Sequence, residues 1–466
     1  MKLYNTLTRQ IDEITPQQPP TVTMYTCGPT VYDYSHIGHW FNYIRMDMLI
    51  RTLKASDLQP IWVMNITDVG HLVSDADDGE DKLEKGARRE GKTAWEVAEF
   101  YTADFLECLD ILQITKPTQI VKATDHIDEQ IALIQTLEEK GYAYVIDDGV
   151  YYDTAQFEGY KAFARLDLDE QQAGARVIFN KQKRNSSDFA LWKFSPKDSQ
   201  RDMEWNSPWG KGFPGWHIEC SAMSMKYLGD TLDIHTGGID HIPVHHTNEI
   251  AQSEAATGKR FANYWMHSNH VMVEGEKISK SLGNGIRLQN IISKGYTAET
   301  VRLYALESNY RTHSQFSWDG LDAAKNRMNG YRAMAALRYQ IKNVTSQTSE
   351  VFLESKKSIH ENLCNDLNTP LALASLSSFT DMYSDKLLSS ENIEDFEEYI
   401  GFIDDLLGLN LSSVKDITDE QKQLLEAREQ ARAAKEWDKS DVIRGQLAGQ
   451  GVGIRDTEHG PIWFPL

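Results

Sequence analysis

The first 70 residues carry a strand pattern, a helix pattern and a second strand pattern. Residues 21–26 (TVTMYT) are rich in β-branched and aromatic types and predict a strand, which the Cys-Gly-Pro sequence of residues 27–29 ends. Apolar residues then recur at helical spacing, which predicts a helix over about residues 38–54. The wholly apolar run of residues 61–64 is typical of a strand buried on both faces. This order predicts a βαβ unit of a parallel sheet.

A second strand–helix–strand pattern lies near the middle of the chain. It predicts a strand over residues 231–235, a helix over residues 247–257 and a strand over residues 262–273. Residues 117–204, between the two units, contain an Asp-Gly turn and many charges, so we interpret them as an insertion that splits the fold. From about residue 320 to residue 413, patterned Leu, Ala and Ile residues predict a helical bundle.

Length and charge limit the classes of protein that fit. A chain of 466 residues exceeds the ~250–300 residues of a single core, so two to four domains are expected. The formal net charge of −21 excludes charge-driven binding of the whole surface to nucleic acid or to an anionic membrane, but it allows a local RNA site. Residues 421–466 hold seven basic and seven acidic residues, so an anionic partner would meet least repulsion there.

The cysteines and the apolar runs indicate the compartment. Four scattered cysteines are too few for a disulfide framework and favour a reducing, cytoplasmic location; they are Cys27, Cys108, Cys220 and Cys364. The N-terminus lacks the apolar centre of a signal peptide, and no apolar run approaches the ~18 residues of a membrane span. We therefore expect no membrane partner, and we expect a monomer.

Two short motifs contain residues that suit a phosphate ligand. The SHIGH sequence of residues 35–39 lies between the first strand and the first helix, where free backbone N–H groups attract an anion. His36 and His39 share a helix face, so both imidazoles can donate to phosphate oxygens, and Gly38 lets a nucleotide approach the backbone. Two ordinary surface histidines near a helix start are the alternative interpretation.

The second motif is KISKS, residues 277–281, which Leu-Gly-Asn-Gly follows. Lys277 and Lys280 in such a loop can close on a polyphosphate, although charged loops are often only solvated. The two motifs are more informative together than alone. Both are expected at the carboxyl ends of strands in the two halves of one doubly wound fold, where such folds bind ligands.

Together these motifs resemble the HIGH and KMSKS signatures of class I aminoacyl-tRNA synthetases, with Ile278 in place of Met. Four longer stretches are similar to the cysteinyl-tRNA synthetase family: YTCGPTVYDYSHIGH (25–39), GWHIECSAMS (215–224), DIHTGGIDHIPVHHTNEIAQSEA (233–255) and KISKSLGN (277–284). The resemblance runs from the first strand to the C-terminal tail. It implies an α/β fold with a doubly wound, Rossmann-like catalytic domain split by an insertion, then a helical bundle and a small anticodon-binding domain.

The resemblance also implies how the chain is divided. The expected parts are a catalytic domain (1–116 and 205–262), a connective insertion (117–204), a stem-contact region with the KISKS loop (263–325), a helical bundle (326–413) and an anticodon-binding domain (414–466). No further segment of the size of an editing domain is left.

A zinc site follows from the same resemblance. The family binds zinc through four residues, which correspond here to Cys27, Cys220, His245 and Glu249. Two thiolates, an imidazole and a carboxylate suit tetrahedral Zn²⁺, and zinc binds the substrate thiolate far better than it binds a serine hydroxyl. Without the resemblance, buried structural cysteines are the simpler interpretation. Cys108 and Cys364 match no family position and are expected to be core thiols. The other candidates for the imidazole ligand are His235, His241 and His246.

Further site residues are implied by their positions in the family. Those implied to bind ATP are Gly38, Gly238, Asp240 and Lys280, and those implied to line the cysteine pocket are Thr67 and Trp216. Those implied to meet the anticodon are Arg432, Trp437, Asp441 and Arg444, whose spacing resembles one anticodon-binding helix of the family. The Asp240 carboxylate would accept from the ribose, and the Trp437 ring would stack on a base. Core packing is the alternative for Trp216, and a charged amphipathic helix with a buried Trp is the alternative for the tail.

The implied activity joins cysteine to tRNA. Cysteine and ATP, with Mg²⁺, would give cysteinyl-adenylate, and the cysteine would then pass to the 3′-terminal ribose of tRNA(Cys). The residues expected to stabilise charge on the phosphates are His36, His39, Lys277 and Lys280. One alternative is a cysteine ligase acting on an amino sugar, of the mycothiol-pathway type, which would lack the anticodon domain. Another is a non-catalytic RNA-binding relative, which would be expected to lose His39 or Lys280.

Two positions depart from the family pattern. Val69-Gly70-His71-Leu72 follows Asp68 where the family usually has acidic residues and a lysine, which puts local contacts of Asp68 in doubt. Thr247 stands where the family often has Glu.

Overall fold

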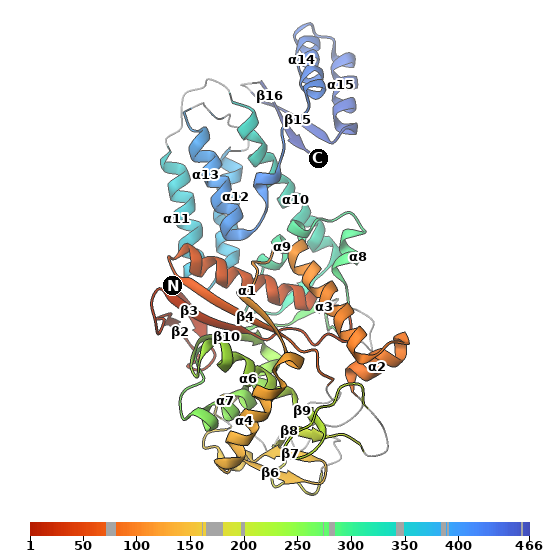
Figure 1. Cartoon of the computed structure of the whole chain (residues 1–466). Coiled ribbons are helices and arrows are strands. Elements are labelled where there is room, and N and C mark those ends of the chain that lie inside the picture. The colour runs from red at the N-terminus through yellow and green to blue at the C-terminus, as the bar shows by residue number, and fades with distance from the viewer. Residues whose placement is uncertain are drawn as a thin grey trace. The chain divides into compact units, whose positions relative to one another are not determined.

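A computed structural model describes most of the chain (Figure 1). The structure describes all residues except 71–80, 161, 165–179, 197–200, 274, 279–284, 342–348, 384–387, 389–390 and 458–459. The chain divides into two compact units, the first comprising Met1–Val271, Lys277–Leu288 and Tyr310–His313 and the second comprising Met272–Glu276, Gln289–Asn309 and Ser314–Leu466. Of the helices in the described part of the chain, none combines the length and the apolar composition needed to cross a bilayer.

A five-stranded parallel sheet forms the centre of the first unit (Figure 1). Its strands are, in spatial order, β11 (Ala262–Ser268), β10 (Leu232–Gly238), β3 (Thr21–Thr26), β4 (Gln59–Ile66) and β5 (Gln119–Lys122). The chain runs outward from β3 through β4 and β5, and outward on the other side through β10 and β11. The sheet is therefore doubly wound, as predicted, and its turning point lies between β3 and β10.

The first βαβ unit confirms the prediction from the hydrophobic pattern. β3 spans the predicted residues, and α1 (Ile37–Ala55) buries the apolar side chains that predicted it. β4 is longer than the apolar run and begins near the surface. The Ile61 side chain is 39% exposed, whereas Trp62 and the residues after it are buried. Only the second half of β4 is therefore buried on both faces.

The prediction of a second strand–helix–strand pattern is confirmed for its helix but is wrong for its last strand. α7 (Thr247–Thr257) has the predicted bounds, and β10 continues through Gly238. The predicted strand over 262–273 is two strands, β11 and β12 (Val271–Val273), which lie in different sheets. They separate at Asn269, beyond the last pair of β11 with β10. The Asn269 N–H donates to the Tyr310 carbonyl at 2.7 Å, and its side-chain oxygen accepts from the His270 N–H at 2.8 Å, so both backbone donors are used outside the ladder.

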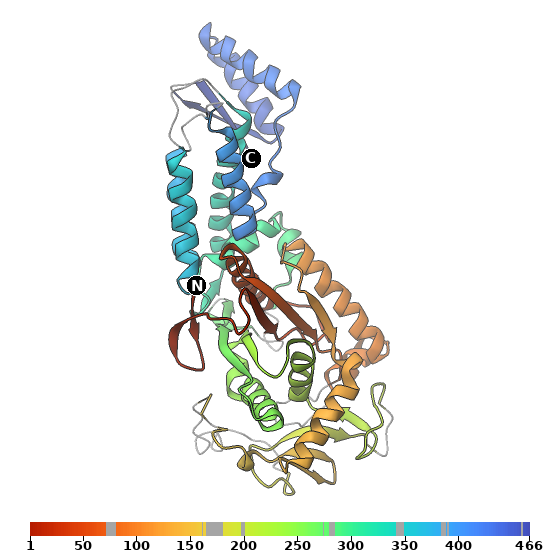
Figure 2. The same cartoon turned by 60° about the vertical axis from the view of Figure 1, so that its left-hand side comes forward.

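Helices cover both faces of the parallel sheet (Figures 1 and 2). α1 packs on one face, and α6 (Trp216–Leu228) packs on the other together with α7. α4 (Ile127–Glu139) packs against α6 and α7. The core on that face is apolar and includes Val63, Ile134, Leu137, Ile218, Met223 and Trp265.

A four-stranded antiparallel sheet belongs to the same unit. Its strands, in spatial order, are β6 (Ala143–Ile146), β7 (Gly149–Tyr152), β8 (Phe189–Phe194) and β9 (Gly212–Pro214). It overlaps the expected insertion 117–204 without coinciding with it, because β5 lies inside that range yet pairs with β4, and β9 lies beyond it yet pairs with β8.

The other elements of this unit are β1 (Lys2–Asn5), β2 (Gln10–Glu13), α2 (Lys82–Glu90), α3 (Ala94–Ile111) and the short turns η1 (Ala123–His126), η2 (Thr154–Gln156), η3 (Ile239–His241) and η4 (Ile242–His246).

The second unit is mainly helical, as predicted (Figure 2). Its helices are α8 (Leu288–Ile292), α9 (Ala298–Leu306), α10 (Trp318–Ala335), η5 (Ala336–Tyr339), α11 (Glu350–Cys364), α12 (Thr369–Tyr383), α13 (Ile393–Leu407), η6 (Leu411–Ser413), α14 (Asp419–Ala433) and α15 (Trp437–Gly449). Helices α11, α12 and α13 run side by side. Its strands include β13 (Glu276–Lys277) and β14 (Ser314–Phe316), which flank β12, and the hairpin β15 (Val452–Thr457) and β16 (Gly460–Pro465).

Candidate functional site

A cavity of about 770 Å³ opens at the carboxyl ends of the parallel strands, at the turning point of the sheet. Each of four strands places a residue at or just beyond its end in the cavity wall. They are Cys27 after β3, Thr67 after β4, Gly238 at the end of β10 and Asn269 after β11. This is where a doubly wound sheet binds its ligands, because the loops diverge there to the two faces.

This cavity brings together residues that are far apart in the sequence. The predicted site residues that line it are Cys27, His36, Gly38, His39, Thr67, Trp216, Cys220, Gly238, Asp240 and His245. Glu249 lies behind the wall and is fully buried. Lys280 and the side chain of Lys277 lie outside the described residues, but Ile278 of the same motif lines the cavity.

The two histidines of the first motif cap the start of α1. The His36 Nδ1 accepts from the Gly38 backbone N–H at 3.2 Å, and the His39 Nδ1 accepts from the His36 backbone N–H at 3.1 Å. Their rings stack with centroids 3.8 Å apart. Because a backbone N–H can only donate, each Nδ1 must be unprotonated, and a neutral ring then carries its proton on Nε2. Both Nε2 atoms are thus hydrogen-bond donors, as a phosphate ligand requires.

Ile278 of the KISKS motif and the segment that follows the motif lie at the start of α1. The Ile37 N–H, one of the helix's otherwise unsatisfied donors, donates to the Ile286 carbonyl at 2.7 Å. A Cβ at Gly38 would lie 3.3 Å from the Ile278 Cδ1 and 3.0 Å from the His36 ring, so glycine permits this close approach. The Arg287 guanidinium lies 3.7 Å from the centre of the Tyr34 ring. The two motifs are therefore neighbours in space, as the sequence predicts.

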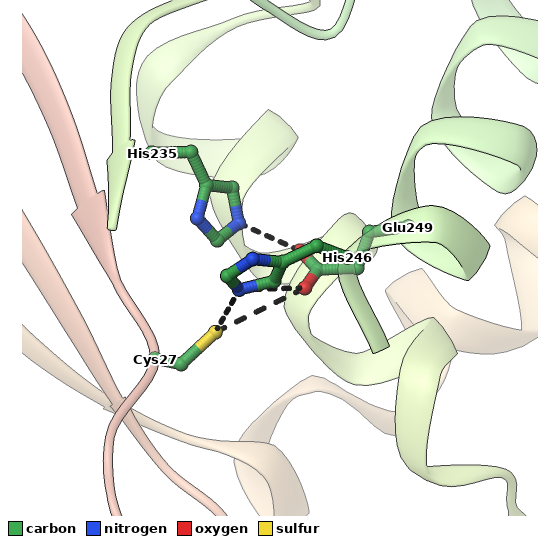
Figure 3. Close-up of side chains that lie close together, drawn as sticks. All are labelled: Cys27, His235, His246 and Glu249. Atoms are coloured by element: carbon green, nitrogen blue, oxygen red, sulfur yellow. Dashed lines mark hydrogen bonds and ion pairs between the residues drawn. The ribbon is translucent and has the colours of Figure 1, made fainter. Parts of the chain in front are cut away.

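Buried ligand-type side chains meet beneath the cavity in two overlapping groups of four, the second of which is drawn in Figure 3. One group is the predicted set of Cys27, Cys220, His245 and Glu249, and the other is Cys27, His235, His246 and Glu249. In each group, the candidate ligand atoms all lie within 4.8 Å of one another. The predicted ligands therefore converge, although Cys27 follows β3 whereas the others lie far along the chain in α6, η4 and α7. Both groups offer the sulfur, nitrogen and oxygen donors that tetrahedral zinc accepts.

Glu249 connects the two groups through its two carboxylate oxygens. Its Oε1 lies 3.0 Å from the His245 Nε2, and its Oε2 lies 2.8 Å from the His235 Nε2. The Cys27 Sγ lies 3.4 Å from the His246 Nε2 and 3.9 Å from the Glu249 Oε1 (Figure 3). The contact with His235 orients the carboxylate, as the outer partners of metal ligands commonly do.

The charges of this buried cluster compensate one another. Burial lowers the pKa of His245, but the Glu249 carboxylate and Cys220 outweigh it and raise that pKa to about 10. Burial raises the pKa of Glu249, but His235 and His245 hold it below its ordinary value. The hydrogen bond with Cys27 lowers the pKa of Cys220, whereas burial raises that of Cys27. Cys220 is thus the better thiolate, and a bound cation would stabilise a second one.

A shell of histidines supports the cluster. The His217 Nδ1 lies 2.9 Å from the His245 Nδ1, which leaves the Nε2 of His245 directed at Glu249. The His246 Nδ1 lies 2.7 Å from the His267 Nε2. Burial lowers the pKa of His246 and of His267 well below the ordinary value, and it lowers the pKa of His241 to about 4. These rings are therefore neutral near pH 7.

The remaining cysteines lie elsewhere. Cys108 is buried in α3, as expected of a core thiol. Cys364, at the end of α11, is partly exposed, and its Sγ lies 3.4 Å from the His360 Nε2. The expectation of a core thiol is therefore wrong for Cys364.

The predicted pocket residues flank the cluster. Thr67 is almost fully buried, whereas Trp216 is partly exposed to the cavity, with its ring centroid 4.6 Å from that of His245. Simple core packing therefore does not describe Trp216. Asp240 is exposed, and a Cβ at Gly238 would lie 2.4 Å from its Oδ1, so this glycine permits the carboxylate's approach.

The two departures from the family pattern have local explanations. The Asp68 carboxylate accepts from the Thr124 N–H at 2.9 Å and from the Thr124 hydroxyl at 2.7 Å, and Val69 packs fully buried beside it. His71 and Leu72 lie outside the described residues. The Thr247 hydroxyl donates to the Ile242 carbonyl at 2.7 Å, so this side chain secures the turn before α7.

The predicted anticodon residues lie on two helices instead of one. Arg432 is in the last turn of α14, and Trp437 begins α15. Between them the chain turns sharply, with Lys435 at φ +61°. Asp441 and Arg444 follow on α15 and are exposed. The single helix expected from the spacing is therefore wrong, because residues 434–436 break it.

Trp437 is a surface residue that is 55% exposed, which contradicts the alternative of a buried Trp. The Arg432 guanidinium lies 5.7 Å from its ring centre. Asp456 holds this arginine at 3.3 Å and also accepts two hydrogen bonds from the buried Arg428, at 2.7 and 2.8 Å. An exposed aromatic ring beside ordered arginines suits a single-stranded RNA base.

Sequence reasoning missed several polar residues that are buried at the site. They include Asn65, His217, Glu219 and His267. A usable signal was present for Glu219, which is the one carboxylate of α6 and directly precedes Cys220. His267 had no comparable signal, because its partners lie 21 and 261 positions away.

Two protein-family models match this chain. Residues 13–326 match the catalytic domain described as tRNA synthetases class I (C). Residues 414–463 match the cysteinyl-tRNA ligase anticodon binding domain. The first match contains the cavity and both groups of ligand-type side chains, and the second contains α14, α15 and nearly all of the β15–β16 hairpin.

Individual proteins match over the whole chain. Cysteine–tRNA ligase 1 of Burkholderia lata is 44% identical over 471 residues, covering 100% of this chain and 97% of the relative. Cysteine–tRNA ligase of Treponema denticola is 39% identical over 498 residues and is covered completely, as is this chain. Among solved structures, methionyl-tRNA synthetase of Mycobacterium tuberculosis bound to methionyl-adenylate has a TM-score of 0.58 at 14% identity, covering 84% of this chain and 93% of that one. This last match concerns the fold alone.

Proposed function

The chain belongs to the cysteine–tRNA ligase family of class I aminoacyl-tRNA synthetases, and we propose that it activates cysteine with ATP and transfers it to tRNA(Cys). One observation carries this proposal. A single cavity is lined by both histidines of the phosphate motif, by the Gly238–Asp240 turn and by three of the four predicted zinc ligands. ATP and cysteine can therefore meet there.

Cysteine-dependent exchange of pyrophosphate into ATP tests the first step. Exchange is expected with cysteine, and serine is expected to support it ~10⁴-fold less well, because the bond that selects the thiolate is not made. Equal exchange with both amino acids, or none with cysteine, would contradict the proposal.

In the first step, a carboxylate oxygen of cysteine attacks the α-phosphorus of ATP. The bond from this phosphorus to the bridging oxygen breaks, and pyrophosphate leaves with that electron pair. The residues' part is positioning and charge stabilisation. The Nε2–H groups of His36 and His39 would donate to phosphate oxygens, and Lys277 and Lys280 would add positive charge. Mg²⁺ is expected to enter with ATP.

The residues proposed to hold zinc are Cys27, Cys220, His245 and Glu249. Three of these four line the cavity, whereas neither His235 nor His246 of the other group does, so only the first group is accessible to a substrate thiol. His235 is then an outer partner that orients Glu249. When bound, zinc would supply a soft Lewis acid that favours a thiolate over a hydroxyl.

In the second step, the 2′-hydroxyl of the tRNA's terminal ribose attacks the acyl carbon of the adenylate, as class I membership implies, and AMP leaves. The C-terminal residues 414–466 would read the anticodon. This segment supports the tRNA ligase over the amino-sugar ligase, which would not need it.

Replacing Trp437 with alanine is expected to lower cysteinylation of tRNA by about 5- to 150-fold at constant salt. The reason is that base stacking contributes ~1–3 kcal/mol and ~1.4 kcal/mol is one decade. The measurement compares tRNA cysteinylation with tRNA-free pyrophosphate exchange, which should stay near wild type.

Val442→Ala is a matched control, since Val442 is also exposed on α15, at 61%, and is not among the predicted anticodon residues. It should change neither assay. Equal loss of both activities in Trp437→Ala would show that this ring serves folding and would reject its anticodon role.

A further inference from the structure

A chain of hydrogen bonds connects the loop that carries Cys27 to helix α6. The Gly28 backbone N–H donates to the Asn65 Oδ1 at 2.8 Å. The Asn65 Nδ2 donates to the Thr67 Oγ1 at 3.0 Å, and the Thr67 hydroxyl donates to the Glu219 Oε2 at 3.3 Å. Asn65, Thr67 and Glu219 are each at most 2% exposed.

The direction of every bond in this chain follows from its first donor. A backbone N–H can only donate, so the atom of Asn65 that faces Gly28 must be the carbonyl oxygen. The amide nitrogen of Asn65 then faces Thr67 and must donate to its oxygen. The Thr67 proton is thereby directed away from Asn65, and the Glu219 carboxylate accepts it.

This arrangement determines what Thr67 can offer a ligand. A hydroxyl has one proton and two lone pairs. The proton is directed to Glu219 and one lone pair is occupied by Asn65. Among the residues that the structure describes, the second lone pair therefore remains as an acceptor. The backbone of Thr67 is also held, because its N–H donates to the Pro29 carbonyl at 3.0 Å and its carbonyl accepts from the Val31 N–H at 3.2 Å. Thr67 lines the cavity as a fixed acceptor.

Cysteine has one group that needs such an acceptor. Under the proposed function, its thiolate belongs at the zinc ligands and its carboxylate reacts beside the histidines of α1. The α-ammonium remains, and it can only donate. Fully buried Glu219 adds a carboxylate behind Thr67, which favours a cation over an anion at this point of the wall.

We propose that Glu219 is a positioning residue that directs the proton of Thr67 away from the cavity, so that the Thr67 oxygen accepts a hydrogen bond from the α-ammonium of cysteine. This inference rests on the proposed function, since it assumes that cysteine occupies the cavity. It makes ammonium recognition by Thr67 depend on Glu219, a residue that does not itself line the cavity.

Three thiol ligands separate the recognition of ammonium from that of the other groups. Cysteine has a thiol, an ammonium and a carboxylate; cysteamine lacks the carboxylate, and 3-mercaptopropionate lacks the ammonium. The test is the Kd of each ligand, measured by titration calorimetry on the zinc-loaded full chain. The variant is Glu219→Gln, whose amide can donate to Thr67 and so turn the hydroxyl proton toward the ligand.

In Glu219→Gln, the Kd of cysteine and of cysteamine should rise by about 10- to 100-fold, the range expected when a hydrogen bond to a charged group is lost. The Kd of 3-mercaptopropionate should stay at the wild-type value. Thr67→Val should show the same selectivity, and the double variant should lose no more than either single one, because both remove one interaction.

Ser224→Ala is the matched control. Ser224 lies on the same helix, is fully buried and donates to the Ser221 carbonyl at 3.2 Å, but it does not line the cavity. It should leave all three Kd values unchanged.

Equal weakening of all three ligands by Glu219→Gln, or no weakening of any, would overturn this inference. Either result is distinguishable from failure of the proposed function, which would appear as absent cysteine-dependent exchange in the wild-type enzyme.

Discussion

Cys220→Ser is expected to remove most of the bound zinc and to slow cysteine-dependent pyrophosphate exchange by about 10³-fold or more. The wild-type chain should hold about one zinc ion, as a four-ligand site does. Changing a residue that only supports a ligand already costs 10- to 100-fold in affinity or activity, and a lost ligand should cost more. Zinc content by elemental analysis and exchange kinetics measure the two effects on one preparation.

Cys364→Ser is the matched control, because Cys364 is far along the chain in the helical unit and only partly buried. It should retain zinc and exchange at wild-type levels. Active wild-type enzyme that contains no zinc would contradict the assignment, and so would full zinc retention and activity in Cys220→Ser.

His39→Asn is expected to slow adenylate formation by about 10²- to 10³-fold, the usual loss when one donor to a developing charge is removed. An asparagine oxygen can take the place of the His39 Nδ1 and accept from the His36 N–H, so the cap of α1 is preserved. The Nε2–H donor, however, is lost. Single-turnover formation of the adenylate at saturating cysteine and ATP measures the effect.

His39→Gln provides the complementary change. Its longer side chain places an amide N–H near the former Nε2 position and gives up the cap. His39→Gln should therefore form the adenylate faster than His39→Asn does, and its melting temperature should be lower than that of His39→Asn. The opposite order of rates would show that His39 acts by capping the helix and would refute its phosphate role.

The central sheet could be predicted from the sequence because its signals are local. The strand over residues 21–26 and the helix after it are encoded by consecutive side chains, and their observed bounds agree closely. The break at Asn269 could not be predicted, since the run over residues 262–273 is rich enough in apolar residues to continue as one strand. The strand ends there because the Asn269 N–H bonds the distant Tyr310 carbonyl and its side chain bonds the His270 N–H, and the first of these partners is set by the fold.

The structure of the C-terminal segment was likewise only partly predictable from the local sequence. The spacing from Arg432 to Arg444 fits one continuous helix, and only the left-handed conformation of Lys435 divides it. That conformation costs energy in a residue other than glycine, so nothing in the local pattern predicts it. The exposure of Trp437 likewise depends on how α14 and α15 pack together.

The site was predictable as a set of residues but not as a coordination geometry. Four ligands followed from the family resemblance, and the fold brings their atoms together. A second group shares Cys27 and Glu249, because β10 supplies His235 and the turn before α7 supplies His246 directly after His245. Choosing between the groups requires knowing which residues line the cavity, and that depends on the packing of α6 against the sheet.

The most direct test of the account offers labelled cysteine and ATP to the purified full chain together with two acceptors. One acceptor is tRNA with a GCA anticodon, and the other is an amino sugar. We predict that the label will appear on the tRNA, as an ester sensitive to mild base, and that it will not appear on the sugar. Label on the amino sugar as a stable amide, with none on the tRNA, would contradict the account.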